Sequence, residues 1–258
     1  MDIEILKSGD NESAFILKGI NPAIANTIRR LVLDEVPVLA VEEINLTKNN
    51  SALYDETIAH RIGLVPLTTD LETYNLPAKC KCKGEGCAKC RVNFKLKAVG
   101  PCIVTAENLE FDDPKVKSVH PKMQIVILLK NQKLEMEGYA TLGIGKDHMK
   151  FSPAHIYYKG YPELVVSGKA NVKTCIDKCD GILKDKGKTL EITDITKWTD
   201  ACEDVCEKNG VEVIASDENF IFYVEPWGQL GLNEILDRAI TIFDEKLDEL
   251  DEEISKIK

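Results

Sequence analysis

The residues that point most clearly to a chemical role are four cysteines that lie within eleven positions. They stand in the segment KCKCKGEGCAKC, which has the spacing C-x-C-x4-C-x2-C: Cys80, Cys82, Cys87 and Cys90. Four thiolates at this spacing can close a tetrahedral metal site, and Gly84 and Gly86 allow a tight fold between them. The interleaved lysines offset the charge of the thiolates and favour deprotonation.

We expect this first cysteine group to hold a structural zinc ion, because four protein ligands leave no open position for a water nucleophile. Two alternatives remain open. The same thiolates could hold an iron–sulfur centre, or the loop could stay free of metal, with its thiols reduced or casually oxidised.

A second cysteine group consists of two pairs with C-x3-C spacing: Cys175 with Cys179, and Cys202 with Cys206. On helices, each pair would lie on one face. The ferredoxin signature C-x2-C-x2-C-x3-C-P is absent, since each pair matches only its C-x3-C fragment and no proline follows. Two disulfides between paired helices are one interpretation, although a reducing compartment argues against them. The other is an insertion stabilised by packing alone.

Catalytic signatures are missing from the chain. No D-x-D-x-D run supplies clustered carboxylates for metal-dependent polymerisation, and no G-x4-G-K-[ST] loop is present. The four histidines are scattered. We therefore expect no catalytic residue in this chain.

Composition limits the compartment and the partners. The 258 residues carry a formal charge of −10, so long-range attraction to nucleic acid and direct DNA binding are not expected. No apolar run is long enough to span a membrane, and no basic-then-apolar leader follows Met1. The sequence predicts a cytoplasmic protein with no membrane contact, in which nine cysteines indicate metal or redox chemistry.

The elements that must position these groups begin with two strands, joined by a turn over 8–11, and a helix after Asn21. Asn21 is a good N-cap, Pro22 suits the first helical position, and Pro37 ends the helix. The helix carries apolar residues at helical spacing, with two arginines beside them: Ile24, Ile28, Leu31 and Val32, and Arg29 and Arg30.

A strand-like run over 38–46 follows, and then a turn and a short amphipathic segment. That segment ends at Gly63 and Pro66 and carries four polar residues: Asp55, Glu56, His60 and Arg61. After a strand-rich middle and a second strand region over 211–224, the pattern predicts one long helix over 232–257.

The last helix carries apolar residues spaced by three or four throughout: Leu232, Leu236, Ile240, Phe243, Leu247, Leu250 and Ile254. At 1.5 Å per residue it is about 40 Å long. The remaining terminal strands and one other helix could hardly cover this length. The stripe therefore indicates a partner helix from another chain, and packing on the protein's own core is the alternative.

Two runs within Asn21–Leu67, PAIANTIRRL and DETIAHRIGLVPL, carry a family resemblance. They resemble the assembly subunit of cellular RNA polymerases: the archaeal D subunit, its eukaryotic third-largest counterparts and bacterial alpha. The absence of the DNA-binding C-terminal domain of bacterial alpha and the presence of the cysteine groups favour the archaeal form.

The resemblance implies an α+β fold with a discontinuous dimerisation domain, built from strands and two helices of which the C-terminal one is long. Its first part would be 1–39. An inserted strand-rich domain with the cysteine loop would cover 40–168. A small ferredoxin-like, cysteine-bearing insertion would follow at 169–210, and 211–258 would complete the dimerisation domain.

The resemblance also implies a role. The chain would be a non-catalytic assembly platform of DNA-directed RNA polymerase that heterodimerises with the smaller L subunit. Its interface would comprise apolar residues of both helices: Ile24, Ile28, Leu31, Val32, Leu236, Ile240, Phe243, Leu247 and Leu250. Small zinc-binding subunits and the second-largest catalytic subunit would bind the heterodimer, with contacts from Arg29, Arg30, Asp55, Glu56, His60 and Arg61.

For the cysteines, the resemblance implies a zinc loop at the first group, as in the eukaryotic counterparts. At the second group it implies an insertion that holds an iron–sulfur cluster in some archaeal members. Two other functions stay open: a stand-alone iron–sulfur redox protein, and a homodimeric scaffold unrelated to transcription.

Overall fold

The computed structural model describes residues 1–9, 11–168 and 170–257. Contacts divide the chain into two compact units. The first comprises Met1–Ser8, Ser13–Asn26 and Tyr157–Tyr223, and the second consists chiefly of Thr27–Ile156 and residues 224–257. The turn expected over 8–11 and the domain boundary expected at Lys169 include residues outside the described part of the chain.

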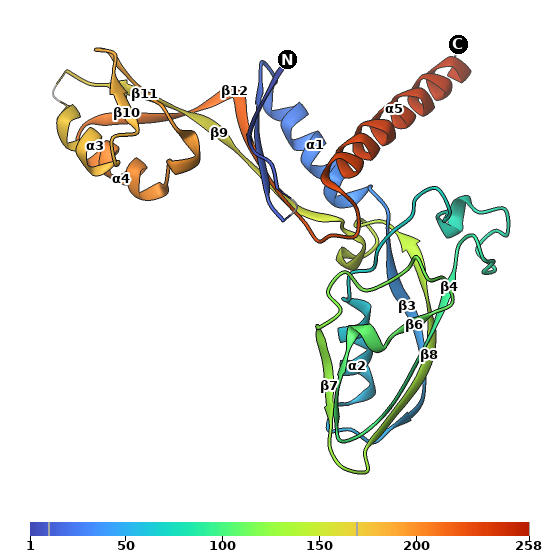
Figure 1. Ribbon diagram of the computed structural model, residues 1–258. Coiled ribbons are helices and arrows are strands. Elements are labelled where there is room, and N and C mark those ends of the chain that lie inside the picture. Colours follow the sequence, from blue (N-terminus) through green and yellow to red (C-terminus); the bar gives the residue numbers. More distant parts are fainter. Residues whose placement is uncertain (10, 169, 258) are drawn as a thin grey trace. The chain divides into compact units, whose positions relative to one another are not determined.

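The first unit is built on a six-stranded sheet with the order β1-β2-β12-β9-β11-β10 (Figure 1). Its strands are β1 (Asp2–Lys7), β2 (Ser13–Lys18), β9 (Ala154–Val166), β10 (Leu183–Asp185), β11 (Thr189–Ile192) and β12 (Val211–Pro226). β2 lies between β1 and β12, and all of its residues except Lys18 are buried. Phe15 stacks on Phe222 with ring centroids 5.3 Å apart.

The long strands β9 and β12 carry the cysteine-bearing insertion. The hairpin β10–β11 extends the sheet at β9, where Leu190 pairs with Leu164. The helices α3 (Val172–Lys178) and α4 (Asp200–Lys208) complete this part. One sheet thus runs across the boundaries expected at 168 and 210, and those boundaries stay predictions.

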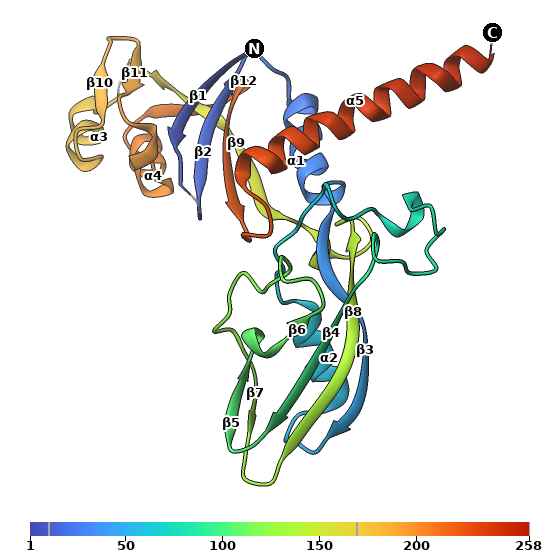
Figure 2. The ribbon, with the colours of Figure 1, turned by 45° about the vertical axis from the view of Figure 1, so that its right-hand side comes forward.

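The second unit contains a four-stranded sheet with the order β3-β8-β4-β6 (Figure 2). Its strands are β3 (Val38–Asn49), β4 (Val92–Val99), β6 (Glu110–Phe111) and β8 (Lys133–Gly143), and a separate ribbon pairs β5 (Cys102–Thr105) with β7 (Gln124–Leu128). The helix α2 (Asp55–Gly63) buries Ile58 and Ile62 in the shared core, and Arg61 donates a hydrogen bond to the Ile125 carbonyl at 2.7 Å.

Two further helices match their expected positions closely. α1 spans Pro22–Asp34, and the Asn21 side chain accepts a hydrogen bond from the Ile24 N–H at 2.9 Å, which confirms the N-cap. α5 spans Leu232–Ile257, as the apolar spacing predicts. Short 3₁₀ turns lie at Pro77–Lys79 (η1), Ala106–Asn108 (η2), Met149–Phe151 (η3) and Ile195–Lys197 (η4). The mixed helix and sheet content confirms the α+β class.

Candidate metal centre and subunit-contact surfaces

The first cysteine group converges on one point. The four Sγ atoms lie within 4.8 Å of one another, and among the described residues only this cluster has such a geometry. Four of the Sγ–Sγ distances are 3.4 Å (Cys82–Cys90), 3.5 Å (Cys80–Cys82 and Cys80–Cys87) and 3.9 Å (Cys87–Cys90). Zinc–sulfur bonds of about 2.3 Å in a tetrahedron place the sulfurs roughly 3.8 Å apart. The thiols therefore fit a tetrahedral zinc ion.

The backbone of the loop explains this convergence. Gly84 and Gly86 adopt φ of 87° and 95°, in the left-handed region where glycine carries no Cβ penalty. The Cys87 N–H donates to the Cys90 sulfur at 3.3 Å. These turns bring the two halves of the loop together.

Protonation differs between the thiols of the first group. The Gly86 N–H and then the Cys90 thiol bond to the Cys82 sulfur, and they lower the pKa of Cys82 to about 6. Burial raises the pKa of Cys90 to about 12. A bound metal ion replaces the remaining protons, so metal uptake releases protons.

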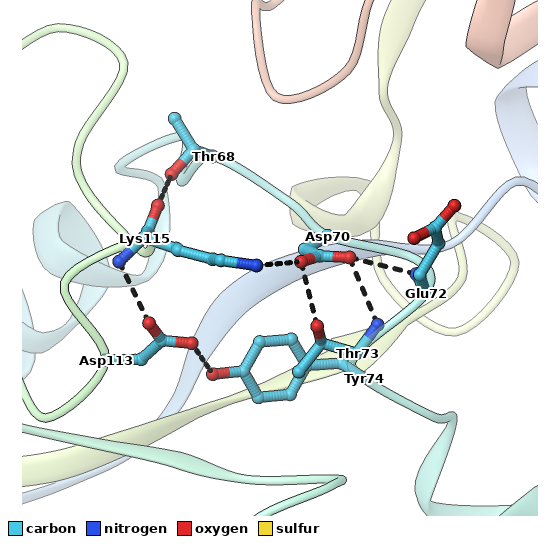
Figure 3. A network of polar contacts seen from close by, with 7 residues as sticks. All are labelled: Thr68, Asp70, Glu72, Thr73, Tyr74, Asp113 and Lys115. Atoms are coloured by element: carbon cyan, nitrogen blue, oxygen red, sulfur yellow. Dashed lines mark hydrogen bonds and ion pairs between the residues drawn. The ribbon is translucent and has the colours of Figure 1, made fainter.

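A polar network anchors the chain on its way into this loop (Figure 3). Asp70 accepts hydrogen bonds from the Thr73 hydroxyl at 2.8 Å and from the Lys115 ammonium at 3.3 Å. The buried Tyr74 donates to Asp113 at 2.6 Å. These hydrogen bonds connect residues 68–74 to residues 113–117 and so fix the position of the segment that precedes the cysteine loop.

Arg91 fixes the other end of the loop. Its Cζ lies 3.6 Å from the centroid of the Tyr139 ring, a cation–π contact. A Cβ added at Gly86 would lie 2.7 Å from Arg91 Cζ, so the guanidinium is held between a ring and a glycine backbone. Sequence reasoning missed this contact, because Tyr139 is far from Arg91 along the chain and only the adjacency of Arg91 to Cys90 gave a signal.

The second cysteine group lies in the core of the insertion. Cys175, Cys179 and Cys206 are at most 1% exposed and pack among Ile182, Leu183 and other apolar residues. All four thiols are free, and they do not share the mutual distances of the first group. Burial raises the pKa of Cys179 to about 12 and also raises the pKa of Cys206, which keeps both thiols protonated.

The apolar stripe of α5 is uncovered in the isolated chain. Its members are 40–58% exposed: Ile240, Phe243, Leu247, Leu250 and Ile254. The helix contacts its own unit through other residues, Ile235, Ala239 and Ile242, which are at most 7% exposed. The expected alternative, in which the stripe packs on the protein's own core, does not describe these five residues. Leu236 is half-buried.

On α1, the expected interface residues divide into two classes. Ile24 is 45% exposed and Ile28 is partly exposed, whereas Leu31 and Val32 are 8% and 0% exposed. Leu31 and Val32 therefore pack inside the chain and offer almost no surface to a partner, because the buried side of α1 includes these two positions.

The polar residues expected to contact other subunits lie on α1 and α2. Glu56 and His60 are exposed. Asp55 accepts a hydrogen bond from Asn49 at 2.7 Å, and Arg61 also bonds within the chain. Arg30 pairs with Asp34 at 3.3 Å, and Arg29 is partly exposed.

Within the described residues, the structure contains no helix that combines the length and apolarity needed to cross a membrane.

Comparisons with known proteins agree with this architecture. Residues 44–156 match the family model described as the RNA polymerase Rpb3/RpoA insert domain. The chain is 35% identical to DNA-directed RNA polymerase subunit Rpo3 of Archaeoglobus fulgidus, over 100% of this chain and 99% of that protein. It is 34% identical to Rpo3 of Pyrococcus furiosus, over 100% and 98%. Since the similarity spans the full chain, this protein belongs to the Rpo3 family of DNA-directed RNA polymerase subunits.

Proposed function

We propose that the chain is an assembly platform that forms a heterodimer with the smaller L subunit of the polymerase and contributes no catalytic residue. The uncovered apolar stripe of α5 carries this proposal. Ile240 and Leu250 are 58% and 56% exposed on a 26-residue helix. Such a repeating apolar face in water is typical of a helix that packs against a partner.

As residues that contact the L subunit we propose this stripe and, on α1, the exposed Ile24 and Ile28, whereas Leu31 and Val32 are buried within the chain. The discontinuous dimerisation domain would then comprise residues 1–39 and 211–258. The segments 40–168 and 169–210 would be inserted between its two parts. The strands β2 and β12 are neighbours in one sheet, and this pairing of an N-terminal with a C-terminal strand supports a domain built from both terminal segments of the chain.

Co-expression with the L subunit tests the heterodimer. A tag on this chain should recover the smaller protein in equimolar amount after a high-salt wash, because apolar burial resists salt whereas exposed ion pairs do not. Failure to recover it, or a stable homodimer in its place, would exclude the proposed heterodimer.

The remaining partners are proposed to bind the completed heterodimer. We infer that small zinc-binding subunits and the second-largest catalytic subunit contact Arg29, Arg30, Asp55, Glu56, His60 and Arg61. The exposure of Glu56 and His60 on α2 supports this role. The double variant Glu56→Lys and His60→Glu should weaken recruitment of those subunits while the heterodimer with the L subunit persists.

We propose that the first cysteine group holds one structural zinc ion and that the second holds no metal. The convergent thiols support the first part, and the packing of Cys175, Cys179 and Cys206 in an apolar core, without the convergence of the first group, supports the other. Metal analysis of anaerobically purified heterodimer tests both parts. About one zinc without iron agrees with them, whereas several irons per chain would indicate a polymerase subunit that carries an iron–sulfur cluster.

A further inference from the structure

A pocket of about 400 Å³ lies beside the cysteine loop, within the second unit. One wall comes from the loop, and the other comes from the end of β8 with the turn after it. Six apolar residues and two acidic residues are among those that line it: Leu76, Pro77, Ala78, Leu142, Ile144 and Phe151, and Glu42 and Asp147. The volume lies within the range of binding sites that take a small ligand or a short segment.

Arg91 is the cation of this pocket, and its guanidinium is already positioned. The Tyr139 ring covers one face at 3.6 Å, and the Gly86 backbone lies against the guanidinium. A side chain held in this way has lost its rotamer freedom before a ligand arrives, which lowers the cost of binding.

The guanidinium has no acidic partner in the described part of the chain. No carboxylate oxygen lies within the 4.0 Å limit of an ion pair, and the buried Arg91 Nε has no hydrogen-bond acceptor. Two nearby carboxylates have other partners: Lys150 binds Glu42 at 2.5 Å, and Tyr139 donates to Glu43 at 2.7 Å. Asp147 also lines the pocket but forms no ion pair with Arg91. Because no carboxylate neutralises it, the guanidinium keeps terminal N–H donors for an incoming acceptor.

We propose that this pocket receives a carboxylate carried on an apolar segment of another polymerase subunit, with Arg91 donating to both carboxylate oxygens. The planar guanidinium matches a carboxylate in two parallel hydrogen bonds. The apolar walls give the residues that flank the acid a surface to bury. The inference rests on the proposed function in one respect, since it takes the chain to be assembled into the polymerase.

A zero-length cross-link tests the proposal in the reconstituted polymerase. The variant Arg91→Lys places a primary amine in the pocket, and a carbodiimide joins an amine only to a carboxylate in direct contact. Peptide mass spectrometry should find position 91 joined to an acidic residue or the C-terminus of another subunit. Arg91→Met, which lacks the amine, is the matched control. Cross-links from position 91 only to Glu42, Glu43 or Asp147, or no cross-link at position 91, would overturn the proposal. A free small acid as the occupant would appear as an amide adduct at position 91 without a second peptide, and this result would also overturn it.

A pocket-filling variant tests the same inference without altering Arg91. Ala78 is exposed and lines the pocket, whereas Ala88 is exposed on the same loop outside it. Ala78→Trp should weaken recruitment of the cross-linked subunit by about tenfold, and Ala88→Trp should not. Zinc content and the heterodimer with the L subunit serve as folding checks. If the wild-type chain forms no heterodimer with the L subunit, the proposed function is wrong. If Ala78→Trp forms the heterodimer and still recruits the cross-linked subunit as well as the wild type does, only the proposal about the pocket is wrong.

Discussion

Ile240 and Ile242 lie two residues apart on α5, yet the first is 58% exposed and the second is 7% exposed. Since neighbouring residues point about 100° apart around a helix, α5 has two apolar faces. The buried face is confined to Ile235, Ala239 and Ile242, and the exposed face continues to Ile254. The face with Ile242 stabilises the chain itself. We attribute the other face, with Ile240, to the partner.

The two faces predict opposite mutant phenotypes. Ile242→Ala should destabilise the isolated chain by about 2–4 kcal/mol, because it leaves a cavity in a packed core. Ile240→Ala should change that stability by less than about 0.5 kcal/mol, because surface truncations remove few contacts. Urea unfolding followed by circular dichroism measures both. Equal losses in the isolated chain would show that the exposed stripe packs internally.

Removal of one thiol should abolish the metal centre. Cys87→Ser leaves three thiolates and lowers zinc affinity, because serine is a poor zinc ligand. Mass spectrometry of the metal content should show less than one zinc per chain. The lone Cys102, which lies outside the group, supplies the matched control Cys102→Ser, which should retain the ion.

Acid should weaken the hydrogen bonds of Asp70 that stabilise the segment before the cysteine loop. Hydrogen bonds from the Thr73 hydroxyl and N–H, with help from Lys115, lower the pKa of Asp70 to about 2 from 3.8. Because the folded-state pKa is the lower one, this stabilisation is present above about pH 4 and is lost as the pH falls toward 2. Asp70→Asn should therefore lower the urea midpoint at pH 7 and have a smaller effect near pH 2. The neighbouring exposed Glu72→Gln is the control, and a pH-independent effect of Asp70→Asn contradicts this explanation.

The thiols of the second cysteine group should differ in reactivity. Cys202 is partly exposed, whereas Cys175, Cys179 and Cys206 are buried. In the native protein purified anaerobically without chelators, iodoacetamide should modify Cys202 first among these four thiols, because burial protects the other three. Mass spectrometry of timed samples measures this order. Uniform protection together with a visible absorption band would indicate an iron–sulfur cluster.

Local signals predicted much of the fold. The Asn21–Pro22 cap and the apolar spacing of 232–257 placed α1 and α5, and the spacing of the first cysteine group predicted its convergence. The six-stranded sheet was not predicted, because β9 joins β12 through pairings between distant residues. Likewise, Ile235 and Ile242 lie next to the stripe in sequence, and only packing shows which face is buried. The contact between Arg91 and Tyr139 is also nonlocal.

Binding of the L subunit to the exposed face of α5 is tested most directly by native mass spectrometry of the purified complex. Ile240→Asp is compared there with Thr241→Asp, which adds the same charge on another side of α5. The wild type and Thr241→Asp should give the mass of this 28.8 kDa chain plus one copy of the smaller protein, whereas Ile240→Asp should give the separate chains, with zinc content unchanged. A heterodimer that persists in Ile240→Asp would contradict this role of α5.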